Sequence, residues 1–121
     1  MGNVLELQKE ALGELVGYSE HILDGINQVI KELRNGRKED TEELFNLVIQ
    51  GINWEIEVFN NCESLINEDE QLVDKSKMAG AVGRLGKVLQ EKDDIKIAAC
   101  LEVDFLPFLH SMEAAALTIS Q

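Results

Sequence analysis

DIKIAACLEVDFLPFLHSMEAAALTI, residues 94–119, is apolar on nearly every side when it is drawn as a helix, and it contains the only proline of the chain. One stripe at helical spacing consists of Ala98, Leu101, Phe105, Phe108, Met112, Ala115 and Ile119. A second stripe on the opposite side consists of Cys100, Val103, Leu106, Pro107, Ala114 and Leu117. A helix that is apolar all round must be buried all round. Because a small bundle covers only one stripe, this segment predicts a helical bundle with surplus apolar surface.

Three further segments carry helical patterns. Residues 4–34 have an apolar stripe at heptad spacing and end at Asn35-Gly36, a typical helix stop. The next helix should open at Asp40, with Glu43 three residues later as in a capping box. Short connections between long helices favour antiparallel neighbours. The sequence therefore predicts one all-α domain over residues 1–121, an up-down-up-down antiparallel four-helix bundle with helices at 4–34, 41–66, 69–91 and 94–119.

Pro107 should interrupt the last of these helices. It has no amide hydrogen, and its ring crowds the carbonyl group of Val103, so the helix is expected to kink there. The kink either wraps the helix over the bundle or forms a recognition notch together with the second apolar stripe and Asp104. Both interpretations remain open at this point.

The helix predicted at 69–91 contains three glycines, Gly80, Gly83 and Gly86. Each weakens a helix by about 1 kcal/mol relative to alanine. We expect them to allow the close approach of another helix, on the side of Gly13 and Gly17. A phosphate-binding loop is excluded here, because the glycine and the Ser/Thr that it requires are missing at the corresponding positions.

The helix predicted at 41–66 also has more apolar surface than one stripe. Trp54 and Val58 belong to its second stripe, together with Leu47 and Leu65. Glu55 falls in the middle of the combined apolar arc, where a carboxylate is paired, protonated or drawn to a seam. Two interpretations follow: Glu55 is a seam residue that reaches water or a neighbouring amide, or it is a functional buried carboxylate.

Charge and composition narrow the classes of function. A net charge of −12 argues against binding to nucleic acid or to an anionic membrane surface. Residues 35–68 hold eight acidic and two basic side chains, and this segment is either a solvated surface or a docking surface for a basic partner. No run of 18 uncharged apolar residues is present, and the first residues lack the basic region of a signal peptide. We therefore expect a cytoplasmic protein that does not span a membrane.

No catalytic residue, cofactor or metal ligand is predicted. A di-iron bundle needs Glu-x-x-His on two helices, but the residues three positions before His21 and His110 are not glutamates. Cys62 and Cys100 lie among apolar residues and outside any C-x-x-C motif, so free buried thiols are expected.

The C-terminal segment carries a resemblance, through Lys92-Asp93, Ala98, Leu101-Glu102, Asp104 and Pro107-x-Leu109. This run resembles a motif in small uncharacterised helical proteins of Firmicute-type bacteria, which reads approximately K-D-Y-x-x-x-A-D-x-L-E-Y-E-x-x-P-x-L. Among its departures, Ala99, Val103 and Asp104 stand where the motif has Asp, Tyr and Glu. The resemblance implies no activity, and the lost carboxylate at Ala99 weakens any metal or catalytic interpretation.

The sequence thus favours a non-enzymatic interaction module, adaptor or chaperone-like. It would form a homodimer or bind a helix of another protein through the surplus apolar faces of helices 41–66 and 94–119. The candidate interaction surface consists of Trp54, Val58, Val103, Asp104, Leu106, Pro107 and Leu117. The alternative is a small-ligand-binding or enzymatic bundle that uses interior carboxylates, namely Glu55, Glu102 or Asp104.

Overall fold

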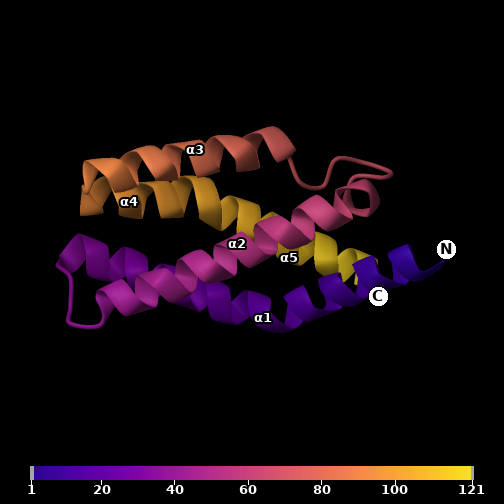
Figure 1. Cartoon of the computed structure of the whole chain (residues 1–121), viewed down its shortest axis with the longest axis horizontal. Helices are drawn as coiled ribbons and strands as arrows, with labels where there is room; N and C mark the ends of the chain where they lie inside the picture. The colour runs from indigo at the N-terminus through magenta and orange to yellow at the C-terminus, as the bar shows by residue number, and fades with distance from the viewer. Residues whose placement is uncertain (1, 121) are drawn as a thin grey trace.

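The computed structural model describes residues 2–120, and every regular element within that range is helical (Figure 1). The first three helices are α1 (Gly2–Asn35), α2 (Thr41–Ile66) and α3 (Lys75–Glu91). The last consists of α4 (Asp94–Cys100), a π-helical segment η1 (Leu101–Phe105) and α5 (Leu106–Ser120). Figure 1 shows the chain reversing its direction at each connection. The prediction of an all-α bundle is therefore confirmed.

The helices do not pack as four equivalent neighbours. α1 is central, because it packs along α2 on one side and along α4 and α5 on the other. α2 also packs against α5, whereas α3 packs mainly against α4 and η1. In Figure 1, α3 and α4 lie together along one edge of the molecule, and α4 is the one of the two that also packs against α1. The largest fully buried side chains include Phe59, Phe105, Leu12, Ile26, Ile52, Leu101 and Met112.

α3 begins at Lys75 and not at residue 69, so that part of the helix prediction was wrong. The side-chain amide of Asn67 donates to the carbonyl oxygen of Val73 at 3.0 Å and accepts from the Val73 N–H at 3.1 Å. These two bonds hold the segment between them as a loop. Asp74 then caps the helix by accepting from the N–H groups of Ser76 and Lys77.

α2 begins at Thr41 as predicted, but the way in which its first turn is capped differs from the prediction. The side chain of Asp40 makes no capping hydrogen bond, so there is no capping box. The hydroxyl group of Thr41 instead accepts from the Lys38 N–H at 2.7 Å and donates to the buried Glu32 carboxylate at 2.6 Å. This bond ties the first turn of α2 to α1, and it lowers the pKa of Glu32 together with a hydrogen bond from Gln28.

The predicted break at Pro107 takes the form of a widened helical turn just before it. The Leu106 N–H donates to the carbonyl oxygen of Leu101, five residues back, as in a π-helix. Pro107 then occupies the first turn of α5, where a missing N–H is tolerated. Figure 1 shows α5 leaving this turn at an angle to α4 and running towards α2.

Close approach between helices occurs at glycines other than the predicted ones. A Cβ atom would meet nothing within 4 Å at Gly13, Gly17, Gly83 and Gly86. The expected contact between these parts of α1 and α3 is absent, because α3 lies against α4. The tight positions are in the α1–α2 pair: a Cβ on Gly51 would lie 3.0 Å from Cγ1 of Ile22, and one on Gly25 would lie 3.2 Å from Cγ2 of Val48.

Candidate functional site

The second apolar stripe of the last helix is largely uncovered. Val103 is 67% exposed and Leu117 is 42% exposed, and Pro107 is also exposed. One residue of the predicted surface was assigned wrongly. Val58 is only 5% exposed and belongs to the core, whereas Leu106 and Trp54 are partly buried against it. The reason is that α2 is packed between α1 and α5, so the bundle covers a second side of α2.

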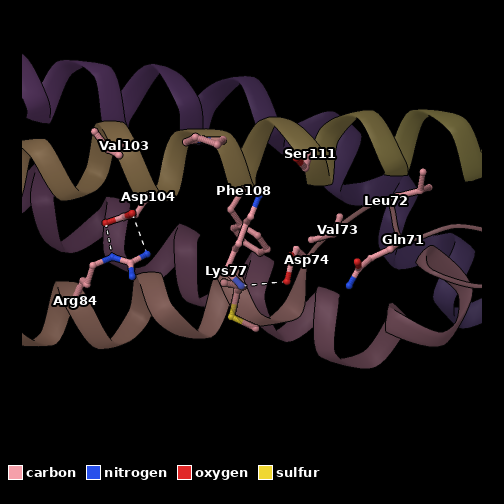
Figure 2. A pocket seen from close by; sticks show the side chains of 12 residues that line it. Gln71, Leu72, Val73, Asp74, Lys77, Arg84, Val103, Asp104, Phe108 and Ser111 are labelled. Atoms are coloured by element: carbon pink, nitrogen blue, oxygen red, sulfur yellow. Dashed lines mark hydrogen bonds and ion pairs between the residues drawn. The ribbon is translucent and has the colours of Figure 1, made fainter.

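The exposed part of this stripe borders a groove between α3 and α5, with a volume of about 720 Å³ (Figure 2). We refer to it as the α3–α5 groove. It is lined by Gln71, Leu72, Val73, Asp74, Lys77, Met78, Arg84, Val103, Asp104, Pro107, Phe108 and Ser111. Val103, Pro107 and Ser111 follow one another at four-residue spacing along one wall, as expected for one face of a helix. Three predicted surface residues, Val103, Asp104 and Pro107, thus come together in one place.

An ion pair stands at one end of the groove. Nε and Nη2 of Arg84 lie 2.9 Å from Oδ2 and Oδ1 of Asp104, in a bidentate arrangement that Figure 2 shows as two dashed lines. A Cβ on Gly80 would lie 3.1 Å from Nη1 of Arg84, so the guanidinium group lies over that glycine. The hydrogen bonds from Arg84 hold the pKa of Asp104 below its usual range. Asp104 therefore remains ionised and paired at neutral pH.

The loop before α3 closes the other end of the groove. The segment that the Asn67 side chain holds in place contributes Gln71, Leu72 and Val73 to the groove. Figure 2 shows these residues at one end of the groove and the Arg84–Asp104 pair at the other. Lys77 projects from the first turns of α3 and is exposed. The groove therefore combines apolar walls with charged groups at several points along its length.

A second uncovered surface lies on α1 and α2, away from the groove. The rings of Tyr18 and Trp54 meet edge to face, with centroids 5.9 Å apart and planes at 82°. Tyr18 is 60% exposed, and Leu47 beside them is 58% exposed. A shallow pocket of about 570 Å³ is lined there by Glu14, Tyr18, His21, Ile22, Leu47, Gln50, Gly51 and Trp54. We refer to these eight residues as the aromatic face.

The prediction included Trp54 but missed Tyr18. The two residues are on different helices, and their contact depends on the register of α1 against α2. That register follows from the close contacts at Gly25 and Gly51, which become visible only when the helices are docked. Leu117 lies near the C-terminal end of α5 and lines neither the groove nor the aromatic face.

Glu55 is fully buried, and neither of its carboxylate oxygens has a hydrogen-bond partner among the described residues. The hydroxyl group of Ser19, also fully buried, is unpartnered in the same way. Burial, together with the nearby charge of Glu113, raises the pKa of Glu55 to about 8. The Glu55 side chain is therefore predominantly protonated at neutral pH. Of the two interpretations of its position, the seam residue that reaches water or an amide is wrong.

The three interior carboxylates considered for chemistry are not brought together. Glu55 lines neither the groove nor the aromatic face, so neither surface gives a ligand access to it. Glu102 is exposed and paired with Arg34 at 2.9 and 3.0 Å, and Asp104 is paired with Arg84. A substrate could not contact all three at once.

The remaining reactive side chains form no constellation in the described part of the chain. Cys62 and Cys100 are free and buried, as expected. Burial raises the pKa of both thiols, that of Cys100 to about 11 with the help of the neighbouring Asp104 carboxylate. Within residues 2–120, no three His, Cys, Asp or Glu side chains are grouped as metal ligands would be. None of the described helices combines the length and the apolar character that crossing a membrane requires.

Fold and surfaces together define a helical bundle that leaves a groove on one side and an aromatic face on another. The chain belongs to the family described as a domain of unknown function, DUF8042, whose model matches residues 10–115. The match extends from the early turns of α1 into α5, and it includes both surfaces and Glu55. Comparison with curated proteins and with solved structures gives no match.

Proposed function

We propose that this protein is a non-enzymatic, cytoplasmic interaction module, of adaptor or chaperone-like type, which binds a helical segment of a partner in the α3–α5 groove. One observation carries the proposal: Val103 and Pro107, one helical turn apart in the stripe that the bundle leaves uncovered, are exposed at the wall of the groove. Exposed apolar surface of this kind is typical of interaction sites.

The shape and chemistry of the groove support a helix as its occupant. A helix docks by placing apolar side chains at spacings of three, four and seven residues into an apolar channel. Val103, Pro107 and the almost buried Phe108 supply such a channel from the last helix, and Met78 supplies its opposite wall. The Arg84–Asp104 pair and Lys77 offer polar contacts that would fix the direction and register of the segment.

The bound segment would come either from a second copy of the chain or from another helical protein. A homodimer would be isologous, so that α5 or its groove would meet its own copy. The molecular mass at micromolar concentration separates these sources. A dimer that Val103→Glu converts to a monomer supports self-association, and a monomer directs the proposal to another protein.

A photo-crosslinking residue at Val103 tests the site directly. The matched control is the same residue at Val82, which is exposed on α3 and does not line the groove. We expect one defined crosslinked product from position 103 in cells, its loss when Arg84 and Asp104 are both changed to alanine, and no such product from position 82. Equal labelling of many proteins from both positions would overturn the proposal.

The alternative is a small-ligand-binding or enzymatic bundle that uses interior carboxylates. The unpartnered carboxyl group of Glu55 is the observation in its favour. Glu55→Gln and Asp104→Asn separate the two functions. Loss of a ligand or of an activity in both variants, with normal binding of the partner, would favour the alternative.

A further inference from the structure

The aromatic face is a second surface, independent of the groove. It is formed by α1 and α2, whereas the groove is formed by α3, the last helix and the loop before α3, and no residue lines both. Tyr18 and Trp54 form its centre, and Leu47 extends it along α2. Tyr18 is 60% exposed and Trp54 is partly buried, and Tyr and Trp are residue types that often dominate binding at protein interfaces.

The charge around this face is of one sign. α2 contains no lysine or arginine along its whole length, and α1 contains none between residues 10 and 30. Glu14 belongs to the face itself. Further exposed carboxylates on these two helices are Glu10, Glu20, Asp24, Glu42, Glu43 and Glu57.

Two basic residues near the α1–α2 connection do not offset this charge. Arg34, in the last turn of α1, is held by Glu102, and Arg37, in the loop after α1, is held by Asp94, at 2.9 Å and 2.8 Å. Their guanidinium groups are therefore directed towards the last helix. α2 and residues 10–30 of α1 thus combine the exposed Tyr18 and the partly buried Trp54 with carboxylates and no lysine or arginine, which gives this surface a negative field.

We propose that the aromatic face binds a basic amphipathic helix of another protein. The apolar stripe of that helix would cover Tyr18, Trp54 and Leu47, and its lysines and arginines would lie towards the carboxylates of α1 and α2. The eight helical steps from Glu14 to Ile22 correspond to about 12 Å, so roughly two turns of a partner helix cover the face.

A second copy of the chain does not meet this requirement. An isologous contact through the aromatic face would place the carboxylates of α1 and α2 opposite the same carboxylates of the copy. Like charges at an interface oppose association. If the α3–α5 groove binds one helical segment and the aromatic face binds another, the protein would connect two partners.

Trp54 is the only tryptophan of the chain, so its fluorescence reports on the face alone. The probe is a tryptophan-free helical peptide of about 15 residues, with leucines at positions i, i+3, i+4 and i+7 and lysines elsewhere. A matched peptide carries glutamate in place of every lysine. We expect the basic peptide to shift the Trp54 emission to shorter wavelength in a saturable way, more weakly as salt is added, and the acidic peptide to have no effect.

Variants assign the effect to the face. Leu47→Gln and Glu14→Lys should each weaken binding of the basic peptide roughly tenfold. Their matched controls are Leu89→Gln, at another exposed leucine on α3, and Glu70→Lys, at an exposed loop position. Both controls, and Val103→Gln in the groove, should bind as the unchanged protein does, and thermal unfolding checks that every variant is folded.

Three results would overturn the inference. The first is no response to the basic peptide, and the second is an equal response to both peptides. The third is a shift of Trp54 emission with protein concentration alone, accompanied by dimerisation that Leu47→Gln abolishes, because a second copy would then be the occupant.

Discussion

α2 and α3 lie on different sides of the bundle and are held in different ways. Nine residues of α2 are buried, between α1 and α5, and two glycines let α1 and α2 approach closely. Only three residues of α3 are buried, Met78, Ala81 and Leu85, because α3 rests mainly against α4 and η1, which are consecutive parts of the last helix. The apolar surplus is therefore covered on the helix that packs between two others, and it remains uncovered beside the helix that packs on the last helix.

The groove is a direct consequence of this difference. If α3 packed on α5 as α2 does, Val103 and Pro107 would be covered. α3 also contains three glycines that weaken it, and two of them make no compensating contact. We therefore expect α3 to be the least stable helix of the bundle. We call the side formed by α1 and α2 the sealed side, and the side of α3, which bears the groove, the open side.

The largest expected effect concerns Glu55 on the sealed side. Its pKa is about 8 in the folded protein and near 4.5 in the unfolded chain, so between these values the folded state binds more protons. The contribution of Glu55 to the free energy of unfolding therefore falls as pH rises from about 4.5 to about 8, by on the order of 5 kcal/mol. Urea unfolding from pH 5 to pH 9 measures it as the difference between the protein and Glu55→Gln.

Glu57→Gln is the control for this measurement, because Glu57 is exposed on the same helix. It should keep the pH dependence of the unchanged protein. Equal slopes for the unchanged protein and Glu55→Gln would show that the carboxyl group is not buried and unpartnered as described.

The next effect compares large-to-small substitutions on the two sides. Phe59 is fully buried in α2 and packs edge to face on Phe108, with ring centroids 6.1 Å apart, so Phe59→Ala should cost about 3–5 kcal/mol. Leu85→Ala on α3 should cost about 2 kcal/mol, because Leu85 is 8% exposed and lies on a helix with only three buried residues. Chemical denaturation measures both, and an equal or larger cost at Leu85 would contradict the comparison.

The smallest effect differs in sign between the sides. Gly51→Ala should destabilise the protein by about 1–3 kcal/mol, because the new methyl group would press on Ile22. Gly83→Ala should stabilise it by about 0.5–1 kcal/mol, because the added Cβ meets nothing and alanine favours the helix. Thermal unfolding of both variants gives the signs, and the same sign at both positions would break the distinction.

Periodicity and turn residues were enough to predict four helices, the bounds of α2 and the covered stripe of the last helix. They could not place the start of α3, which depends on the bonds between the Asn67 side chain and the backbone of Val73. Periodicity also could not predict that Val58 is buried and Val103 is exposed, because each belongs to the second apolar stripe of its own helix. That outcome depends on which helices become neighbours, which the pattern of a single helix does not contain.

Native-state hydrogen exchange tests the central claim, that one side of the bundle is sealed and the side bearing the groove is open. We expect the amides of α3 to exchange through a local opening of low free energy. The amides of α2 around Ile52–Phe59 should exchange at a higher free energy, because their exchange requires global unfolding. Equal protection of α3 and α2 would contradict it.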